Sequence, residues 1–382
     1  MAIGRWGSLA LLSVIRVAMG VQFQSVGAAG PAIRDELGLD YASLGALTGS
    51  YLILGVFLAL PAGWLSARFG DRRILLAGLA LMVAGGVGLG LAGSFPVALA
   101  CRLLAGAGAV LLAIVVSKLV MDRFDGESLP LAMGVLLGAW PLGIGGGSIL
   151  LPYLVDAIGW RGVMLATAAA CAGFFVLAAW AVPPAPRAAG ASGRLSGAAI
   201  AAVMAAGTIW MLANAGYIIL LGFAPAYFVE QGMTLAAAGA ILSLASFATI
   251  PGGPIGGWLG QRIGAPMTMT VISIGLVSIG IAALPWSAHP AWLLLAIGAV
   301  LGLPAGLIVA LPAQVLAPAQ RAVGMGLFYS VFYAGIGLLS PFAGWVRDFS
   351  GAPYAPLLVA AALNLLAVVA IGAFVMLARR VV

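Results

Sequence analysis

The chain has few charged residues, few cysteines and little histidine. Only 7% of its 382 residues are charged, whereas a soluble domain carries about 25%. So few charges cannot make a water-soluble surface, and most of the surface must therefore face lipid. Cys101 and Cys171 lie inside apolar runs, and there is one histidine. The sequence gives no sign of a disulfide framework, a metal cluster or an enzyme's nucleophile or nucleotide motif.

Long apolar runs take the place of the missing charges. A membrane-spanning helix needs about 20 apolar residues. Twelve such runs are separated by polar or Gly/Pro breaks, at about 8–30, 41–66, 73–94, 96–120, 129–155, 161–182, 197–222, 235–259, 266–285, 291–313, 322–345 and 353–378. The sequence therefore predicts an all-α membrane protein of twelve transmembrane helices. The first run has the length of a full span and no small-residue cleavage site, so we expect a retained helix.

The basic residues are unevenly divided between the two sides of these spans. The formal net charge is +7, and orientation in a membrane explains it better than nucleic-acid binding does. One side carries Arg5, Arg68, Arg72, Arg73, Lys118, Arg123, Arg187, Arg194, Arg262, Arg321, Arg379 and Arg380, and the other only Arg34, Arg161 and Arg347. Positive residues stay cytoplasmic, so we expect a multi-pass inner-membrane protein with both termini inside.

Two segments of the chain repeat each other at an offset of 194 residues. Residues 61–70 and 255–264 share Gly-Trp-Leu-x-x-Arg-x-Gly, and at the same offset Pro31 matches Pro225, Gly38 matches Gly232 and Gly45 matches Gly239. An even number of spans separates the two segments, so the halves have the same orientation, as in a parallel transporter repeat. We predict a six-helix bundle over 1–182, a cytoplasmic linker at 183–196 and a second six-helix bundle over 197–382.

The loop after the second span carries a family resemblance. Its Gly63-x-x-x-x-Arg68-x-Gly70-Asp71-Arg72-Arg73 is similar to the cytoplasmic loop signature of the major facilitator superfamily. That resemblance implies a gating loop made of Gly63, Arg68, Gly70, Asp71 and Arg72. The family usually has an acidic residue where Ala67 stands, so either Asp71 takes that role or the latch is weaker.

Other segments extend the resemblance over the whole chain. Arg102-x-x-x-Gly106-x-Gly108 resembles the family's fourth-helix motif, and Gly138-x-x-Pro141-x-x-x-Gly145-Gly146 loosely resembles its fifth-helix antiporter motif. The arginine in the first span and the segment 22–27 look most like the cyanate-permease-like group, near the nitrate/nitrite porters. Trp140 precedes Pro141, where a missing backbone hydrogen bond predicts a kink.

Two arginines lie deep in predicted spans, Arg16 in span one and Arg102 in span four, and no Asp or Glu lies equally deep. An intramembrane charge is costly and marks a candidate site. An arginine without a carboxylate partner should attract an anion, because its planar fork donates two parallel hydrogen bonds. The alternatives are that Arg102 only bonds helix-end carbonyls and that Arg16 only reaches a headgroup.

Polar and aromatic side chains share helix faces that could meet these arginines. Gln24 lies on the Arg16 side of span one, Asn214 and Tyr217 share a face of span seven, and Tyr329 and Tyr333 share a face of span eleven. The family resemblance implies that helices one, four, seven and eleven line a central cavity. We therefore predict a substrate site of Arg16, Arg102, Gln24, Trp140, Asn214, Tyr217, Tyr329 and Tyr333; for each ring, core packing is the alternative.

Three functions compete. The first is a secondary active transporter, likewise implied by the family, that moves a small inorganic or carboxylate anion by alternating access, with a proton or counter-anion as coupling partner. The second is a proton-coupled multidrug or metabolite efflux antiporter, which the lack of a deep carboxylate argues against. The third is a membrane sensor, for which no soluble output domain is seen. We expect no enzyme, no metal, no cofactor and no nucleic acid, and a monomer in contact with membrane lipid.

Overall fold

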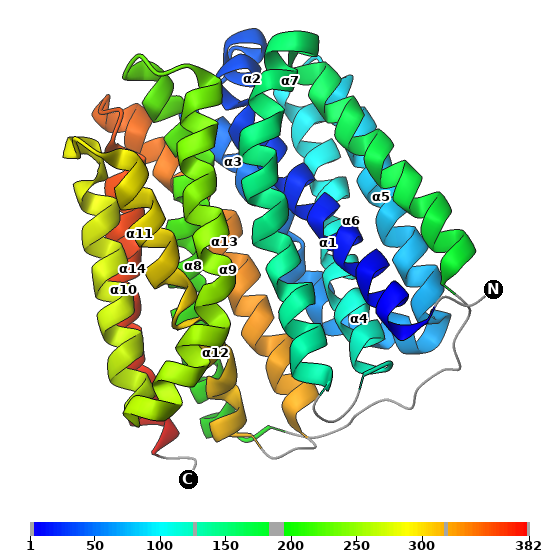
Figure 1. Ribbon diagram of the computed structural model, residues 1–382, viewed down its shortest axis with the longest axis vertical. Helices are drawn as coiled ribbons and strands as arrows, with labels where there is room; N and C mark the ends of the chain where they lie inside the picture. Colours follow the sequence, from blue (N-terminus) through cyan, green and yellow to red (C-terminus); the bar gives the residue numbers. More distant parts are fainter. Residues whose placement is uncertain (1–3, 125–127, 183–194, 317–319, 380–382) are drawn as a thin grey trace.

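Figure 1 shows the computed structural model of the chain, which is almost entirely helical. The structure describes residues 4–124, 128–182, 195–316 and 320–379. Its α-helices are α1 (Arg5–Ala28), α2 (Gly30–Leu37), α3 (Tyr41–Ile53), α4 (Gly55–Phe69), α5 (Asp71–Gly90), α6 (Phe95–Met121), α7 (Ser128–Ala181), α8 (Gly197–Glu230), α9 (Leu235–Ile263), α10 (Pro266–Ala283), α11 (Pro290–Gly302), α12 (Ala305–Ala310), α13 (Arg321–Ser350) and α14 (Ala355–Ala378). Two short 3-10 helices, η1 (Leu284–Trp286) and η2 (Leu311–Gln314), follow α10 and α12.

The predicted all-α membrane architecture is confirmed. Within the described residues, 11 helical segments are long and apolar enough to cross a membrane. One of them is α7, a run of 54 residues whose helical angles are interrupted at Gly159 (φ 72°, ψ 167°). That interruption separates the fifth and sixth predicted spans, so the twelve apolar runs are all accounted for. Pro141 lies inside α7, and the kink predicted there stays a prediction.

Glycines with a left-handed backbone mark the two repeats. Six glycines in the described chain have positive φ, and four of them form pairs at the repeat offset of 194: Gly38 with Gly232, and Gly70 with Gly264. Only glycine adopts this conformation at little cost. The helix starts match as well, because Asp40 caps α3 and Thr234, at the same offset, caps α9 with a side-chain oxygen. These pairs support the internal repeat predicted from the sequence.

The helices lie in two groups side by side (Figure 1), α1 to α7 in the first group and α8 to α14 in the second. The division into bundles at 183–196 stays a prediction, since 183–194 lie outside the described residues. We call the end of the molecule that carries the start of α1 and the end of α14 the terminal face, and the end that carries α2 the α2 face. Which face is cytoplasmic is likewise a prediction.

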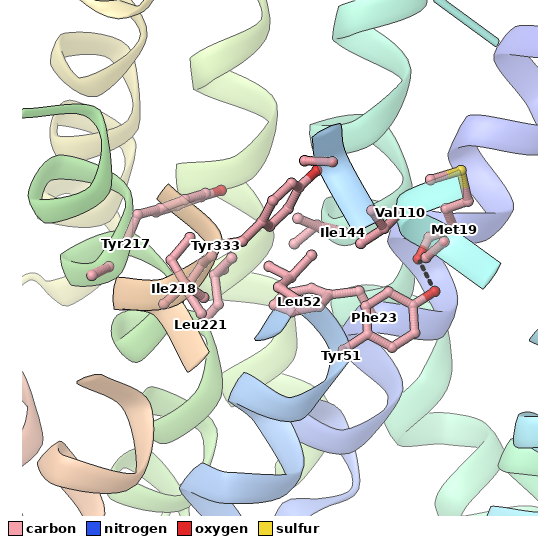
Figure 2. Close-up of a cluster of buried hydrophobic side chains, with 14 of the residues drawn as sticks. Met19, Phe23, Tyr51, Leu52, Val110, Ile144, Tyr217, Ile218, Leu221 and Tyr333 are labelled. Atoms are coloured by element: carbon pink, nitrogen blue, oxygen red, sulfur yellow. Dashed lines mark hydrogen bonds between the residues drawn. The ribbon is translucent and has the colours of Figure 1, made fainter. Parts of the chain in front are cut away.

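An apolar layer joins the two groups in the middle of the molecule. Figure 2 shows Phe23, Leu52, Leu221 and Tyr333, from α1, α3, α8 and α13, gathered in one buried cluster. Met19 and Phe23 follow Arg16 along α1 in the direction of α2. The layer therefore lies between the level of Arg16 and the α2 face.

Candidate functional site

Arg16 lies in the middle of α1, eleven residues after Arg5 and twelve before Ala28. At 3.6 residues per turn, its side chain leaves the helix nearly opposite to a face that lines an apolar groove open to the outside of the bundle. That groove is lined by Val14, Val17, Ala18, Val21, Thr167, Ala170 and Phe174. Arg16 therefore points into the bundle, yet its side chain stays partly exposed.

The guanidinium of Arg16 has no carboxylate partner among the described residues. Its Nε is buried without a hydrogen-bond acceptor, and the same holds for Nε2 of Gln24 and Nε1 of Trp210. The side chains that interact with it electrostatically are Tyr329 and Tyr333 of α13. Three N–H donors thus lie in or beside the predicted site without a protein acceptor.

The second group of helices contributes a cluster of aromatic rings to this site. Phe332 is at its centre, with ring centroids 5.0 Å from Tyr333, 6.2 Å from Tyr329 and 6.0 Å from Trp210 of α8. Tyr329, Phe332 and Trp210 are partly exposed, whereas Tyr333 is buried. Trp210 of α8 and Phe332 of α13 therefore meet, next to the two tyrosines that interact with Arg16.

The two polar residues that were predicted on α8 are partly engaged elsewhere. The side-chain amide of Asn214 donates to the carbonyl of Trp210 (2.8 Å) in its own helix. The Tyr217 hydroxyl donates to Oγ of Ser246 on α9 (2.9 Å). Asn214 stays partly exposed on the same side as Trp210, whereas Tyr217 is buried and joins two helices of the second group.

Gln24 and Trp140 are contributed by the first group. Gln24 is 1% exposed and lies two turns beyond Arg16 along α1. The ring of Trp140 lies 5.5 Å from that of Phe23, and a methyl group on Gly20 would sit 2.6 Å from the Trp140 carbonyl oxygen. Glycine at this position thus allows α1 and α7 to approach closely on the Arg16 face.

Arg102 is held in a different way from Arg16. It is 1% exposed, and Nε, Nη1 and Nη2 donate to the carbonyls of Leu47 (3.1 Å), Gln22 (2.9 Å) and Phe23 (2.6 Å). Its Cζ lies 4.3 Å from the Tyr51 ring centroid, a cation–π contact. Arg102 joins α6 to α1 and α3, and its described contacts do not bring it to Arg16. The expected meeting of the two guanidinium groups is therefore not seen.

The predicted gating loop forms a charge cluster within the first group. Gly70 ends α4 with a φ of 88°, and Asp71 begins α5. Asp71 is 3% exposed, accepts a hydrogen bond from Ser66 and pairs with Lys118 of α6 at 2.6 Å. Arg72 donates to the carbonyl of Ala179 at the end of α7. Gly63 lies inside α4, and Arg68 is exposed near its end.

The α2 face carries a set of contacts between the groups that the sequence does not reveal. Nη2 of Arg347 in α13 donates to Glu230 of α8 (2.6 Å) and to the Tyr41 hydroxyl of α3 (2.9 Å). Tyr41 in turn donates to Glu230. Oδ1 and Oδ2 of Asp348 accept from the backbone N–H groups of Tyr41 (3.1 Å) and Ala42 (2.8 Å), which caps α3 from the other group. We call Tyr41, Glu230, Arg347 and Asp348 the α2-face latch.

Close backbone contacts accompany this latch. A methyl group on Gly45 would sit 2.4 Å from the carbonyl oxygen of Ser340, and one on Gly239 would sit 1.9 Å from that of Ser148. The first pair joins α3 to α13 and the second joins α9 to α7, so the two groups are packed backbone to backbone toward the α2 face. Gly45 and Gly239 stand at the repeat offset, which is the sequence signal that could have indicated this packing.

Comparisons with known proteins agree with this architecture. A profile of the Major Facilitator Superfamily matches residues 12–317 and 199–381. Among solved structures, the xylose transporter XylE from E. coli in an inward open conformation superposes with a TM-score of 0.79 at 14% identity, over 97% of this chain and 96% of that one. A bacterial homologue of the human lysosomal transporter Spinster, inward-facing and occupied, gives 0.74 at 18% identity, over 99% and 97%. At such identities these structures show the fold alone.

Three relatives are similar over part of the chain. The tetracenomycin C resistance and export protein of Streptomyces glaucescens is 29% identical over 64% of this chain and 48% of its own length. The cyanate transport protein CynX of Escherichia coli (strain K12) is 26% identical over 62% of each chain. The 4-hydroxybenzoate transporter PcaK of Pseudomonas putida is 29% identical over 42% and 36%. The matched segments thus span less than two thirds of each relative.

Proposed function

Because the chain belongs to the Major Facilitator Superfamily, we propose that it is a secondary transporter that moves a small anion by alternating access, with Arg16 as the group that binds the anion. The observation that carries this proposal is the set of N–H donors without protein acceptors, Nε of Arg16, Nε2 of Gln24 and Nε1 of Trp210. Unpaired buried donors favour a ligand rich in acceptor oxygens. The cyanate and 4-hydroxybenzoate relatives are named for anions.

An anion that binds the closed conformation more tightly than the open one can drive alternating access through this difference in binding free energy. In the absence of a carboxylate partner, the charge of Arg16 is stabilised only by surrounding dipoles, which is costly at mid-membrane depth. An anion beside Arg16 neutralises that charge and lowers the cost of closing the terminal side around it. A ligand can shift a conformational equilibrium only through such a differential interaction.

The alternative is an efflux antiporter, and one specific observation favours it: the tetracenomycin C relative is a resistance and export protein. Against it stands the site itself. Among the described residues, no Asp or Glu lies in the middle of a span where it could exchange a proton for a cationic drug, and Arg16 cannot lose its proton in a protein.

Transport by the purified protein in liposomes tests the proposal. We expect Arg16→Gln to abolish accumulation of the anion that the wild type carries. Arg16→Lys, which keeps the charge but loses the planar fork, should reduce it sharply. Arg5→Gln, at the exposed start of the same helix, is the matched control and should leave transport unchanged. Transport by Arg16→Gln at the wild-type rate would contradict the proposal, whatever the substrate.

A further inference from the structure

We propose that the site takes an aromatic monoanion, such as an aromatic carboxylate, in preference to a small inorganic anion or a dianion. This inference rests on the proposed function, because it assumes that Arg16 binds an anion. It specifies the net charge of the ligand and the chemical character of its uncharged part. The arrangement of the neighbouring side chains determines both.

The charge of the ligand follows from the number of cations that are free to bind it. Of the two arginines inside spans, Arg102 has its guanidinium surrounded by three backbone carbonyls and the Tyr51 ring. Lys118 is engaged with Asp71 at 2.6 Å. Among the cations inside the described spans, Arg16 alone remains, so a ligand of charge −1 leaves the site neutral. A ligand of charge −2 would bring an uncompensated charge into the bundle, which is strongly unfavourable.

The aromatic cluster beside Arg16 indicates that the uncharged part of the ligand is an aromatic ring. Tyr329, Phe332 and Trp210 are partly exposed and present ring surface from α13 and α8. Rings attract one another in offset-stacked or edge-to-face arrangements with centroids about 4.5–7 Å apart. A small inorganic anion would need hydrogen-bond donors on most sides to replace its water, and here rings occupy one whole side. One cation beside aromatic surface suits a planar ring with a single carboxylate.

The position of the unpartnered Trp210 donor agrees with a ligand that extends away from Arg16. Gln24 lies eight residues beyond Arg16, about 12 Å along the helix axis and past Phe23 of the apolar layer, so a ligand bound to Arg16 does not contact Gln24 in this conformation. An aromatic acid bound to Arg16 through its carboxylate extends away from that residue, along rings that carry the unpartnered Nε1 of Trp210.

Calorimetric titration of the purified protein with a matched set of ligands tests this inference. Benzoate is compared with cyclohexanecarboxylate (same charge, no aromatic ring), benzamide (same ring, no charge), terephthalate (two charges) and nitrate and cyanate (small anions). We expect benzoate to bind about 3- to 10-fold more tightly than cyclohexanecarboxylate. We expect it to bind at least roughly 10-fold more tightly than the remaining four ligands.

A pair of variants locates the preference in the ring cluster. Phe332→Leu should bring the ratio of benzoate to cyclohexanecarboxylate affinity close to one. Phe342→Leu makes the same change on the outer side of α13, where Phe342 is 46% exposed and stacks on Trp345, and should leave the ratio unchanged. The wild-type ligand series decides the question even if Phe332→Leu does not fold.

The failure of this inference and the failure of the proposed function give different results. Nitrate or cyanate binding at least as tightly as benzoate, with loss of binding in Arg16→Gln, would overturn the aromatic substrate class and leave the anion transporter intact. Equal affinities for benzoate and cyclohexanecarboxylate would overturn the aromatic requirement. Binding of a lipophilic cation such as tetraphenylphosphonium, with no anion bound, would overturn both.

Discussion

Arg16 and Arg102 are two arginines inside membrane spans, Arg16 in the middle of α1 and Arg102 level with Gln22 and Phe23 nearer the α2 face, and the structure holds them in opposite ways. Arg102 is 1% exposed and has three carbonyl acceptors and a ring beneath its guanidinium. Arg16 is partly exposed and has a buried Nε without an acceptor. The same residue type thus serves packing in one helix and is available for a ligand in the other.

This difference separates two ways of stabilising a charge inside a membrane protein. Backbone carbonyls are fixed, so Arg102 contributes the same interaction in every state in which α1, α3 and α6 stay packed. The tyrosines that interact with Arg16 belong to α13, in the other group of helices. An interaction across the groups changes when the groups move, which is what a transported ligand requires.

Removal of Arg102 is expected to have the largest effect on folding. Arg102→Gln deletes the donors to the carbonyls of Gln22, Phe23 and Leu47 and the cation–π contact with Tyr51. We expect a loss of at least about 3 kcal/mol in the free energy of unfolding. Thermal melting of the purified variants measures it, with Arg16→Gln as the comparison. Arg16→Gln should melt near the wild type; equal losses in the two variants would mean that the arginines do not differ.

A change at Gly55 should impair the Arg16 site without touching either arginine. A methyl group at Gly55 would lie 2.2 Å from the Tyr333 ring, so Gly55→Ala must displace that ring from the Arg16 side. We expect the affinity for the transported anion to fall roughly 10-fold, or about 1.4 kcal/mol. Gly146→Ala is the control, because no atom lies within 4 Å of the added methyl. Unchanged affinity in Gly55→Ala would exclude Tyr333 from the site.

The α2-face latch tests whether the two groups separate at that end. Glu230→Gln weakens the hydrogen bond that Glu230 accepts across the groups from the Tyr41 hydroxyl of α3, and it also removes the ion pair with Arg347 within the second group. We expect the open state at this face to gain population by about 1 kcal/mol, or roughly five-fold. Spin labels at Asp156→Cys and Ala288→Cys, with Cys101 and Cys171 replaced, report the distance. Glu36→Gln on the same face, whose partner Arg161 is in the first group, should leave the distribution unchanged.

The smallest effect is expected for the exposed ion pair of Glu36. The guanidinium of Arg161, followed by the indole of Trp160, holds the pKa of Glu36 below its ordinary value of 4.5. A lowered folded-state pKa stabilises the fold above the ordinary value, and that contribution is lost as the pH falls through the lowered one. The melting difference between wild type and Glu36→Gln should therefore be constant near neutral pH, shrink below the ordinary pKa and vanish below the lowered pKa. A difference that grows on acidification would contradict this.

The fold could be predicted from the sequence because lipid imposes it. Apolar runs of span length can satisfy their backbone only as helices, and Gly38, Gly70, Gly232 and Gly264 mark ends of helices by their left-handed backbone. The placement of Gln24 on the Arg16 side of α1 followed from helical periodicity alone. Each of these properties depends only on residues that are close together in the sequence.

The partners of Arg102 and the α2-face latch could not be predicted, because they depend on distances between segments. The sequence offered backbone carbonyls as an alternative for Arg102, but the carbonyls of Gln22 and Leu47 have no side-chain signature, so it could not identify which carbonyls accept. Glu230 and Arg347 were known only as charges on the same side of the membrane; that they pair depends on how α8 meets α13. Clusters of charge at one face predict that pairs exist, not which residues form them.

The apolar layer of Phe23, Leu52, Leu221 and Tyr333 also determines where a membrane voltage would act. An electric field drops mainly across the part of a protein that solvent does not enter. Where solvent reaches Arg16 from the terminal face, the voltage falls across the apolar residues between Arg16 and the α2 face and not around the binding site. Binding would then be nearly independent of voltage, whereas the step that moves the layer past the charge of Arg16 would carry up to about 2.3 kcal/mol per 100 mV.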